Sequence, residues 1–149
     1  MYDLFRSFLF RLDAERAHGL TLGLARLGGS MPPSRWLMRR LFNYIDPRLE
    51  TQAFGLAFRN PVGLAAGYDK NGVAAAGLAA IGFGHLEIGT VTRQPQAGNP
   101  RPRIHRLVAS RAVVNSMGFP NRGIAALPDR LRAQAGDATI GEEIGRAHV

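Results

Sequence analysis

Cysteine is absent from this 149-residue sequence, which excludes disulfide bonds and thiolate metal ligands. The sequence also has no uncharged apolar run near the roughly 20 residues that a membrane-spanning helix needs. We recognise no secretory signal at its start, so the cytoplasmic side is the expected compartment. A chain of this kind that meets a bilayer is expected to lie on its surface.

Several chemical signatures are missing as well. The 4 histidines share no spacing with one another or with carboxylates that is typical of a metal site, so we expect no metal. The sequence has no G-x-S-x-G elbow, no phosphate-binding P-loop and no G-x-G-x-x-G motif. The corresponding hydrolase, nucleotide-hydrolysing and dinucleotide-binding classes therefore receive no support.

Lysine is almost absent. The 19 basic residues include a single lysine, Lys70, and the rest are arginine. A compact ammonium and a planar guanidinium are not interchangeable, so the retained lysine is a candidate functional cation. The formal net charge of +8 favours anionic partners such as nucleic acid, an acidic membrane surface or a small acidic metabolite, without choosing among them.

Short amphipathic helices are predicted within residues 1–48. The first covers about 2–12, and Asp13 is expected to cap a second that ends at the Gly28-Gly29 pair. A third, over about 35–43, mixes Trp36 and other apolar residues with arginines, as at a bilayer interface. Amphipathic helices more often pack on the rest of a protein, so both alternatives stay open at this point.

Beyond a boundary near residue 48, small residues, glycine and short apolar runs replace the arginine-studded helices. The predicted order is hairpin or strand, strand, small-residue helix, strand, loop, extended segment, helix and strand, over 51–58, 62–66, 71–81, 85–91, 92–102, 112–115, 123–135 and 138–141. Repeated βα units predict a parallel α/β sheet, open or closed into a barrel. Its functional loops would lie at the C-terminal ends of the strands.

Two loops follow the first two predicted parallel strands. Residues 65–72 combine small residues with Lys70, and Thr90 stands near the end of the second strand. Small residues let a flat ligand approach the backbone, while Lys70 offers a positive charge and Thr90 a hydroxyl. The pattern suits a planar cofactor beside an anion, although a glycine turn with a surface lysine would give the same local sequence.

A third candidate loop, residues 115–121, presents amides, a hydroxyl and a glycine that could bind carboxylate or imide oxygens. Its last residue, Asn121, could equally serve only as a helix cap. Four nearby arginines could meet phosphates, but without interleaved aromatic residues they are expected to form a solvated face: Arg101, Arg103, Arg106 and Arg111.

Four separated blocks together resemble the dihydroorotate dehydrogenase family, and they lie at residues 60–70, 82–92, 95–103 and 115–119. The order and spacing match over roughly residues 1–141. The helical start, including residues 12–18, resembles the extension of the class 2, quinone-linked members, which attach peripherally to the bacterial inner membrane on its cytoplasmic side. Ser116 and Pro120 depart from the class 2 pattern, which usually has Arg and Asn there, and give the loop some class 1 character.

The resemblance implies a (β/α)8 TIM barrel, of which only the N-terminal part is present. Residues 1–48 would be a helical extension associated with membrane and quinone, and 49–141 the first part of an FMN-binding α/β barrel. It implies FMN contacts from Ala66, Gly67, Tyr68, Asp69, Lys70 and Thr90. Lys70 would also contact dihydroorotate, together with the loop Asn115, Ser116, Met117, Gly118 and Phe119.

The implied reaction is oxidation of (S)-dihydroorotate to orotate in de novo pyrimidine (UMP) biosynthesis. A base takes a proton from C5, hydride passes from C6 to flavin N5, and a quinone reoxidises the flavin. The family's catalytic base and flavin-phosphate site belong to later segments, so no catalytic residue is expected in this chain. A closed barrel takes about 250 residues. The chain alone is therefore expected to be inactive.

Residues 142–149 are expected to be a foreign tail. Where the family continues into an Asn-Ile-Gly strand end, this chain has Glu142 and then residues 143–149, EIGRAHV. That heptapeptide is a translation of common sequencing-adapter DNA, GAG ATC GGA AGA GCA CAC GTC. A longer clone that continues through EIGRAHV would refute this hypothesis.

Two other classes remain as alternatives. A class 1-like enzyme or another FMN-dependent barrel oxidoreductase would share the loops without needing the helical extension, and would use a different electron acceptor. An arginine-rich nucleic-acid-binding module would bind with steep salt dependence, but the scattered arginines lack an aromatic platform, so we expect no nucleic acid partner.

Overall fold

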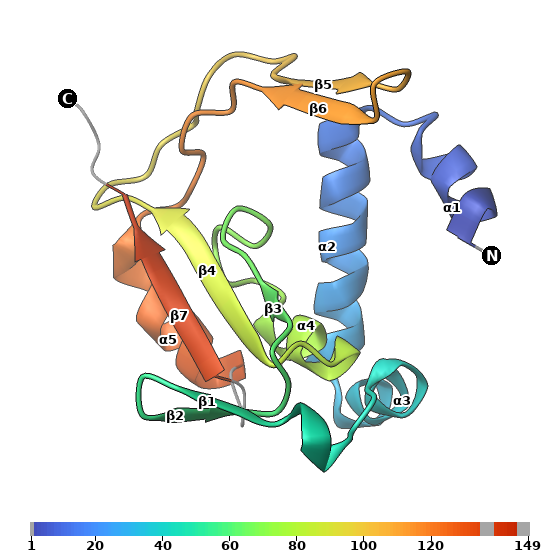
Figure 1. The fold of residues 1–149 in the computed structure, drawn as a ribbon. Helices are drawn as coiled ribbons and strands as arrows, with labels where there is room; N and C mark the ends of the chain where they lie inside the picture. The colour runs from blue at the N-terminus through green and yellow to red at the C-terminus, as the bar shows by residue number, and fades with distance from the viewer. Residues whose placement is uncertain (1, 135–138, 146–149) are drawn as a thin grey trace.

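The computed structural model describes residues 2–134 and 139–145 and has a mixed α/β architecture (Figure 1). It begins with three helices, α1 (Tyr2–Leu9), α2 (Ala14–Ser30) and α3 (Pro32–Phe42). The long α2 stands beside the sheet, with α1 near its N-terminal end and α3 across its foot (Figure 1). The predicted helical start is therefore present.

The ends of α2 follow from its sequence. The carboxylate of Asp13 accepts the backbone N–H groups of Glu15 and Arg16, each at 3.0 Å, which confirms the predicted cap. The predicted end at Gly28 and Gly29 is wrong, because the helix continues to Ser30. It stops only where Met31 precedes proline, a position that disfavours helical geometry.

The central sheet is parallel, with strand order β3-β4-β7. Its strands are β3 (Gly63–Leu64), β4 (His85–Val91) and β7 (Thr139–Ile144). β4 has its predicted bounds, whereas β3 is shorter than the predicted 62–66. The predicted parallel arrangement of βα units is confirmed for these strands.

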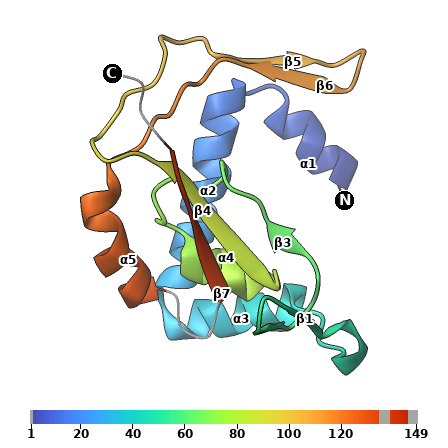
Figure 2. The same cartoon turned by 60° about the vertical axis from the view of Figure 1, so that its left-hand side comes forward.

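Two helices accompany this sheet, α4 (Ala75–Ile81) and α5 (Leu127–Gln134), the latter preceded by a 3-10 turn, η2 (Ile124–Ala126). α4 lies between the sheet and α2 (Figures 1 and 2). It starts later than the predicted residue 71, because the segment before it is a turn. A cluster of apolar side chains from α2, α4, β4 and α5 forms the core: Ala25, Ala74, Ala75, Leu78, Leu86, Ile88, Val91, Leu127 and Leu131.

Antiparallel hairpins stand at opposite ends of the sheet. After the 3-10 turn η1 (Pro47–Leu49), β1 (Thr51–Ala53) pairs with β2 (Leu56–Phe58), as the prediction of a hairpin arm allowed. At the other end, β5 (Ile104–Leu107) pairs with β6 (Ala112–Asn115) beside the N-terminal end of α2 (Figure 1). β6 was predicted as extended, but β5 was not predicted.

The N-terminal helices pack on the rest of the protein through small residues and leave many of their large apolar side chains exposed to solvent. In α2 the buried residues are Ala17, Ala25 and Gly29. Large apolar side chains of α2 and α3 remain exposed: Leu20, Leu24, Leu27, Trp36, Leu37, Leu41 and Phe42. Among the helices of the described residues, none is long and apolar enough to cross a membrane.

Candidate functional site

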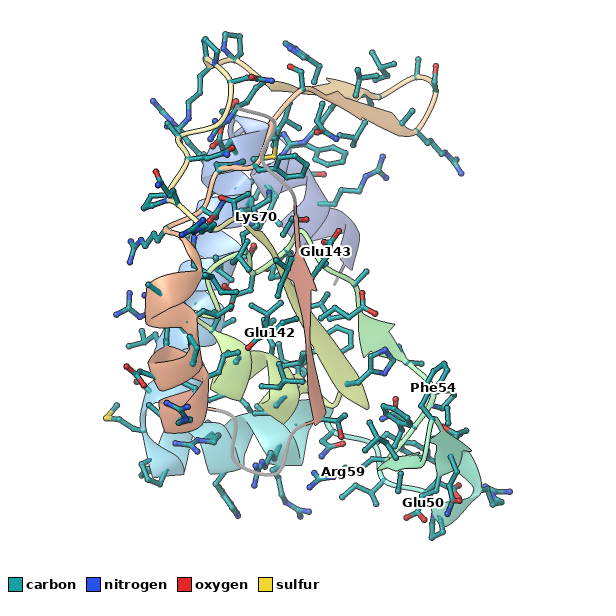
Figure 3. The ribbon with its side chains drawn as sticks, turned by 90° about the vertical axis from the view of Figure 1, so that its left-hand side faces the viewer. Glu50, Phe54, Arg59, Lys70, Glu142 and Glu143 are labelled. Carbon is teal, nitrogen blue, oxygen red and sulfur yellow. The ribbon has the colours of Figure 1, made fainter. Side chains whose placement is uncertain are left out.

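The candidate loops gather at the C-terminal ends of β3 and β4. The backbone N–H of Gly67, in the loop after β3, donates to the carbonyl of Gly89 in β4 at 2.7 Å, which joins the two strand ends. Lys70 and Glu143 lie at this end, whereas Glu50, Phe54 and Arg59 lie at the other (Figure 3). The sheet therefore places the predicted cofactor loops side by side, at the edge where α/β proteins usually bind ligands.

Asp69 shapes the loop after β3. The residue is 1% exposed, and its two carboxylate oxygens accept the backbone N–H groups of Val73 at 2.9 Å and Ala74 at 2.7 Å. These bonds satisfy donors at the start of α4. Asp69 thus fixes the turn that presents its neighbours Tyr68 and Lys70.

Lys70 is half-buried, and its ammonium nitrogen lies 3.7 Å from the sulfur of Met117. Burial lowers the pKa of Lys70, the charge of Arg103 lowers it further, and Glu15 opposes them. Within residues 2–134 and 139–145, no carboxylate forms an ion pair with this ammonium. A partly desolvated cation whose near contact is a thioether is well suited to receive an anionic ligand.

Tyr68 connects the same loop to the helical start. Its hydroxyl donates to the Thr21 hydroxyl of α2 at 2.9 Å, and its ring forms a T-shaped contact with His18, with the ring centroids 4.9 Å apart. Burial lowers the pKa of His18, and the charge of Lys70 lowers it further. His18 is a site neighbour that the sequence analysis did not single out, although its motif was part of the family resemblance.

Space for a flat ligand exists beside Gly67. This residue has φ of +105°, and a side-chain carbon added there would meet nothing within 4 Å. The neighbouring Ala66 is only partly buried. The expectation that small residues leave the backbone open to a planar group is consistent with this geometry.

Thr90 is 8% exposed, and its hydroxyl donates to the carboxylate of Glu143 at 2.6 Å. Gly89 lies so close to the backbone of Glu143 that a side chain at Gly89 would collide with it. Glu143 belongs to the segment 142–149 that is expected to be foreign, and that expectation stays a prediction. Residues 146–149 lie outside the described residues. The Thr90 hydroxyl is therefore occupied by a carboxylate in this chain.

The predicted substrate loop 115–119 lies above this edge and is largely exposed. Met117 is its half-buried member and reaches Lys70, whereas Phe119 remains 42% exposed. The fold therefore brings Lys70 into contact with Met117 of this loop. It leaves the side chains of Asn115 and Ser116 exposed to solvent.

Asn121 ties this loop to the end of β4. It is 6% exposed; its amide NH2 donates to the Thr92 hydroxyl at 2.9 Å and the Phe119 carbonyl at 2.7 Å. Its amide oxygen accepts the backbone N–H groups of Thr92 at 3.2 Å and Gly123 at 2.8 Å. Asn121 does more than cap a helix, because it links two site segments through one buried side chain.

The expected solvated arginine face is wrong for Arg103. Arg103 has 6% of its side chain exposed, whereas Arg101 has 72% exposed, and both pair with Glu15 of α2. Arg106 lies over the Phe10 ring, with its guanidinium carbon 4.8 Å from the ring centroid. In the part of the chain that the structure describes, no group of three acidic or histidine side chains is placed to hold a metal ion.

These features define an α/β protein with a candidate ligand site at the C-terminal ends of parallel strands, built around a small-residue loop and a half-buried lysine. The family model described as dihydroorotate dehydrogenase matches residues 48–142. The chain belongs to the dihydroorotate dehydrogenase family.

Curated relatives agree with this assignment. The chain is 49% identical to a protein named dihydroorotate dehydrogenase (quinone) from Thermobifida fusca, over 98% of this chain and 40% of that protein. It is 51% identical to a protein of the same name from Acidithiobacillus ferrooxidans, over 97% of this chain and 40% of that protein. The chain thus spans about two-fifths of the length of these relatives.

Solved structures give the same result. Ligand-free DHODH from Eimeria tenella is similar with a TM-score of 0.76 and 36% identity, over 90% of this chain and 37% of that chain. Its complex with ferulenol gives a TM-score of 0.74, also at 36% identity, over 89% of this chain and 35% of that chain. The described fold therefore corresponds to one part of a larger enzyme fold.

Proposed function

We propose that the full-length protein containing this chain oxidises (S)-dihydroorotate to orotate in UMP biosynthesis, with FMN as cofactor and a quinone as electron acceptor. The observation that carries this proposal is the half-buried ammonium of Lys70, held between the cofactor loop and Met117 of the substrate loop. The quinone-linked curated relatives, which match nearly the whole chain, support the choice of acceptor.

The residues present fit a flavin. Gly67 leaves open space for a flat ring, and the partly desolvated Lys70 offers a cation beside it. We assign FMN contacts to the residues named from the resemblance: Ala66, Gly67, Tyr68, Asp69, Lys70 and Thr90. When bound, FMN would supply the oxidant that takes hydride from dihydroorotate and passes its electrons to the quinone.

The protein's own residues would hold and orient the reactants. Asp69 fixes the turn, and Lys70 stabilises negative charge on the cofactor or on the carboxylate of the substrate. The substrate contacts are assigned to Lys70 and the loop Asn115, Ser116, Met117, Gly118 and Phe119. Thr90 would have to release Glu143 before its hydroxyl could donate to the cofactor, although the hydroxyl oxygen can still accept.

The rest of the site is assigned to chain beyond the region described. The three-stranded parallel sheet would be the opening part of a (β/α)8 barrel whose later segments supply the catalytic base and the phosphate site. By itself this chain is therefore proposed to be inactive.

The helical start is proposed to lie on the cytoplasmic face of a bacterial inner membrane. Its exposed apolar side chains include Leu24 and Leu27 of α2 and Trp36 of α3, and arginines stand among them on α3. Apolar side chains mixed with Trp and Arg favour the interface of a bilayer, where the quinone is dissolved. Binding of the full-length protein to anionic vesicles, lost on replacing Trp36 and Leu41 by serine, tests this attachment.

The function is tested on the full-length protein, by flavin absorbance, its bleaching with dihydroorotate and its recovery with a quinone. Lys70→Ala is expected to lose bound flavin or to lower turnover by at least about 100-fold, because it removes the charge at the site. Arg93→Ala, which removes an exposed cation just beyond β4, is the matched control and should bleach and recover as the wild type does.

The outcomes separate the alternatives. A wild-type protein without flavin, or with flavin indifferent to dihydroorotate, contradicts the proposal. Recovery with fumarate or NAD but not with quinone assigns a class 1-like enzyme, which Ser116 and Pro120 of the substrate loop would favour. Binding to nucleic acid that weakens steeply with salt, without flavin, would identify the arginine-rich binding module.

A further inference from the structure

Arg103 is a buried junction between three segments. Its Nη2 and Nε donate to the carboxylate of Glu15, at 2.5 and 3.1 Å, and its Nη1 donates to the carbonyls of Ala97 at 2.8 Å and Asn99 at 2.9 Å. A planar guanidinium can satisfy these separate acceptors at once, whereas an ammonium cannot reproduce the geometry. The first turn of α2 is thereby attached to the loop before β5.

The same loop holds the backbone of the substrate segment. The N–H of Ser116 donates to the carbonyl of Arg103 at 2.9 Å, and the N–H of Asn99 donates to the carbonyl of Met117 at 3.0 Å. The side-chain amide of Asn99 also donates to the carbonyl of Ser116 at 2.6 Å. The backbone of residues 116 and 117 is thus held by residues 99 and 103, while the Met117 side chain contacts Lys70.

Glu15 supplies the counter-charge for this junction. Its hydrogen bond from Arg103 lowers the pKa of its carboxyl, although burial opposes that effect, so the carboxylate remains ionised at neutral pH. Removing the carboxylate would leave the buried guanidinium of Arg103 uncompensated, which is costly in a desolvated position. The two groups therefore act as one unit.

We infer that Glu15 and Arg103 form a positioning pair that fixes the substrate loop beside Lys70 and so sets the affinity for dihydroorotate. The pair joins the helical extension to the substrate site by direct contacts: Glu15 belongs to α2, and Arg103 binds the loop that holds Ser116 and Met117. The claim about affinity rests on the proposed function, whereas the claim about the loop does not.

The chain offers a matched control two residues away. Arg101 also donates to Glu15, at 2.9 Å, but 72% of its side chain is exposed, and the carbonyls of Ala97 and Asn99 accept from Arg103. Arg101→Lys and Arg103→Lys therefore make the same chemical change in two partners of one carboxylate. The first partner is exposed and the second is buried. A difference between them isolates the buried contacts.

The first measurement is backbone amide exchange of the full-length protein in segment 115–119. Arg103→Lys and Glu15→Gln are expected to speed exchange there by about tenfold or more, because the loop loses its support, while Arg101→Lys stays within about twofold of the wild type. Glu15→Gln keeps the arginine and covers the case in which Arg103→Lys fails to fold. Unchanged exchange in both Arg103→Lys and Glu15→Gln overturns the inference.

The second measurement is steady-state kinetics with flavin content determined in each variant. Arg103→Lys and Glu15→Gln should raise the KM for dihydroorotate on the order of tenfold, with flavin content and the KM for quinone within about twofold of the wild type. If both KM values rise equally and flavin content falls as well, the pair supports the whole fold and not the substrate loop in particular. That outcome overturns the inference. A wild type that does not oxidise dihydroorotate contradicts the proposed function, and the exchange result then decides the loop claim alone.

Discussion

The sequence predicts that Lys70 is functional, but it does not predict the electrostatic environment of its ammonium group. Its rarity among 19 basic residues marked it from the sequence, and the structure places it, half-buried, between two candidate loops. The physical consequence of that position, its lowered pKa, could not be predicted, because it depends on burial and on Arg103. Arg103 was assigned to a solvated face because sequence carries no direct signal for which arginine is buried.

The lowered pKa of Lys70 predicts an alkaline limit to ligand binding. A depressed pKa means that the cation is lost, as pH rises, at a pH below the ordinary lysine value of 10.5. Orotate binding to the full-length protein should therefore weaken as the pH rises, with a midpoint below pH 10.5. Because Glu15 raises this pKa, Glu15→Gln should move the midpoint to lower pH.

Spectroscopic titration of orotate against the flavin, repeated across pH, measures this midpoint in the wild type and in Glu15→Gln. Arg93→Ala provides the control for a general loss of positive charge, since Arg93 is exposed. A midpoint at or above 10.5 in the wild type, or one that Glu15→Gln leaves in place, would contradict the electrostatic account.

At the scale of elements, periodicity located the buried parts well. β4 was predicted with the bounds it has, because Leu86, Ile88 and Val91 give a short segment typical of a largely buried strand. β5 was missed, since its alternation is short and includes His105 and Arg106. The end of α2 was misplaced because Gly29 acts there as a packing surface and not as a stop signal.

The contact of α2 with α4 depends on glycine. A side-chain carbon on Gly77 would overlap the carbonyl of Ala25, and one on Gly29 would overlap the backbone at Gly77. Gly77→Ala is therefore expected to lower the free energy of unfolding of the full-length protein by about 1–3 kcal/mol, because the helices must separate. Gly23→Ala, also in α2, would meet nothing within 4 Å and should raise it by about 0.5–1 kcal/mol.

Urea denaturation followed by circular dichroism measures both variants against the wild type. Opposite shifts of the two midpoints are the expected result. Equal shifts would mean that intrinsic helix propensity, and not the close approach of the two backbones, governs substitution of these glycines.

At the scale of the whole molecule, the described residues leave strand edges unpaired and apolar surface exposed. β3 and β7 are the outer strands of the parallel sheet, and a cavity of about 440 Å³ opens at the opposite end from Lys70, beneath the hairpin β1–β2. Phe58, Ile140 and His85 line it, and Phe54 of the hairpin is 100% exposed. Apolar surface and open strand edges of this kind favour association with further chain.

Produced alone, the 149-residue chain is therefore expected to purify without flavin, to enhance the fluorescence of a hydrophobic dye and to self-associate. Absorbance, dye fluorescence and light scattering measure the three properties, with the full-length protein as comparison. A monomeric yellow product holding one flavin per chain would show that these residues suffice for the cofactor site.

The larger architecture could be inferred only by resemblance. Local pattern predicted parallel βα units, and the sheet order β3-β4-β7 agrees with them, but closure into a barrel depends on contacts between segments far apart in the chain. The family assignment, by contrast, required no structure, because four separated motifs at fixed spacing are specific together.

A single stripe of α2 makes all the attachments described for this helix. Glu15 meets Arg103, His18 and Thr21 meet Tyr68, and Ala25 and Gly29 lie against α4. Because each residue advances a helix by about 100°, inserting or deleting one residue within α2 would turn one end out of phase with the other. Relatives that preserve both attachments should therefore differ along the leucine-bearing face by substitution, and should keep the length of this helix constant or change it only in steps close to whole turns.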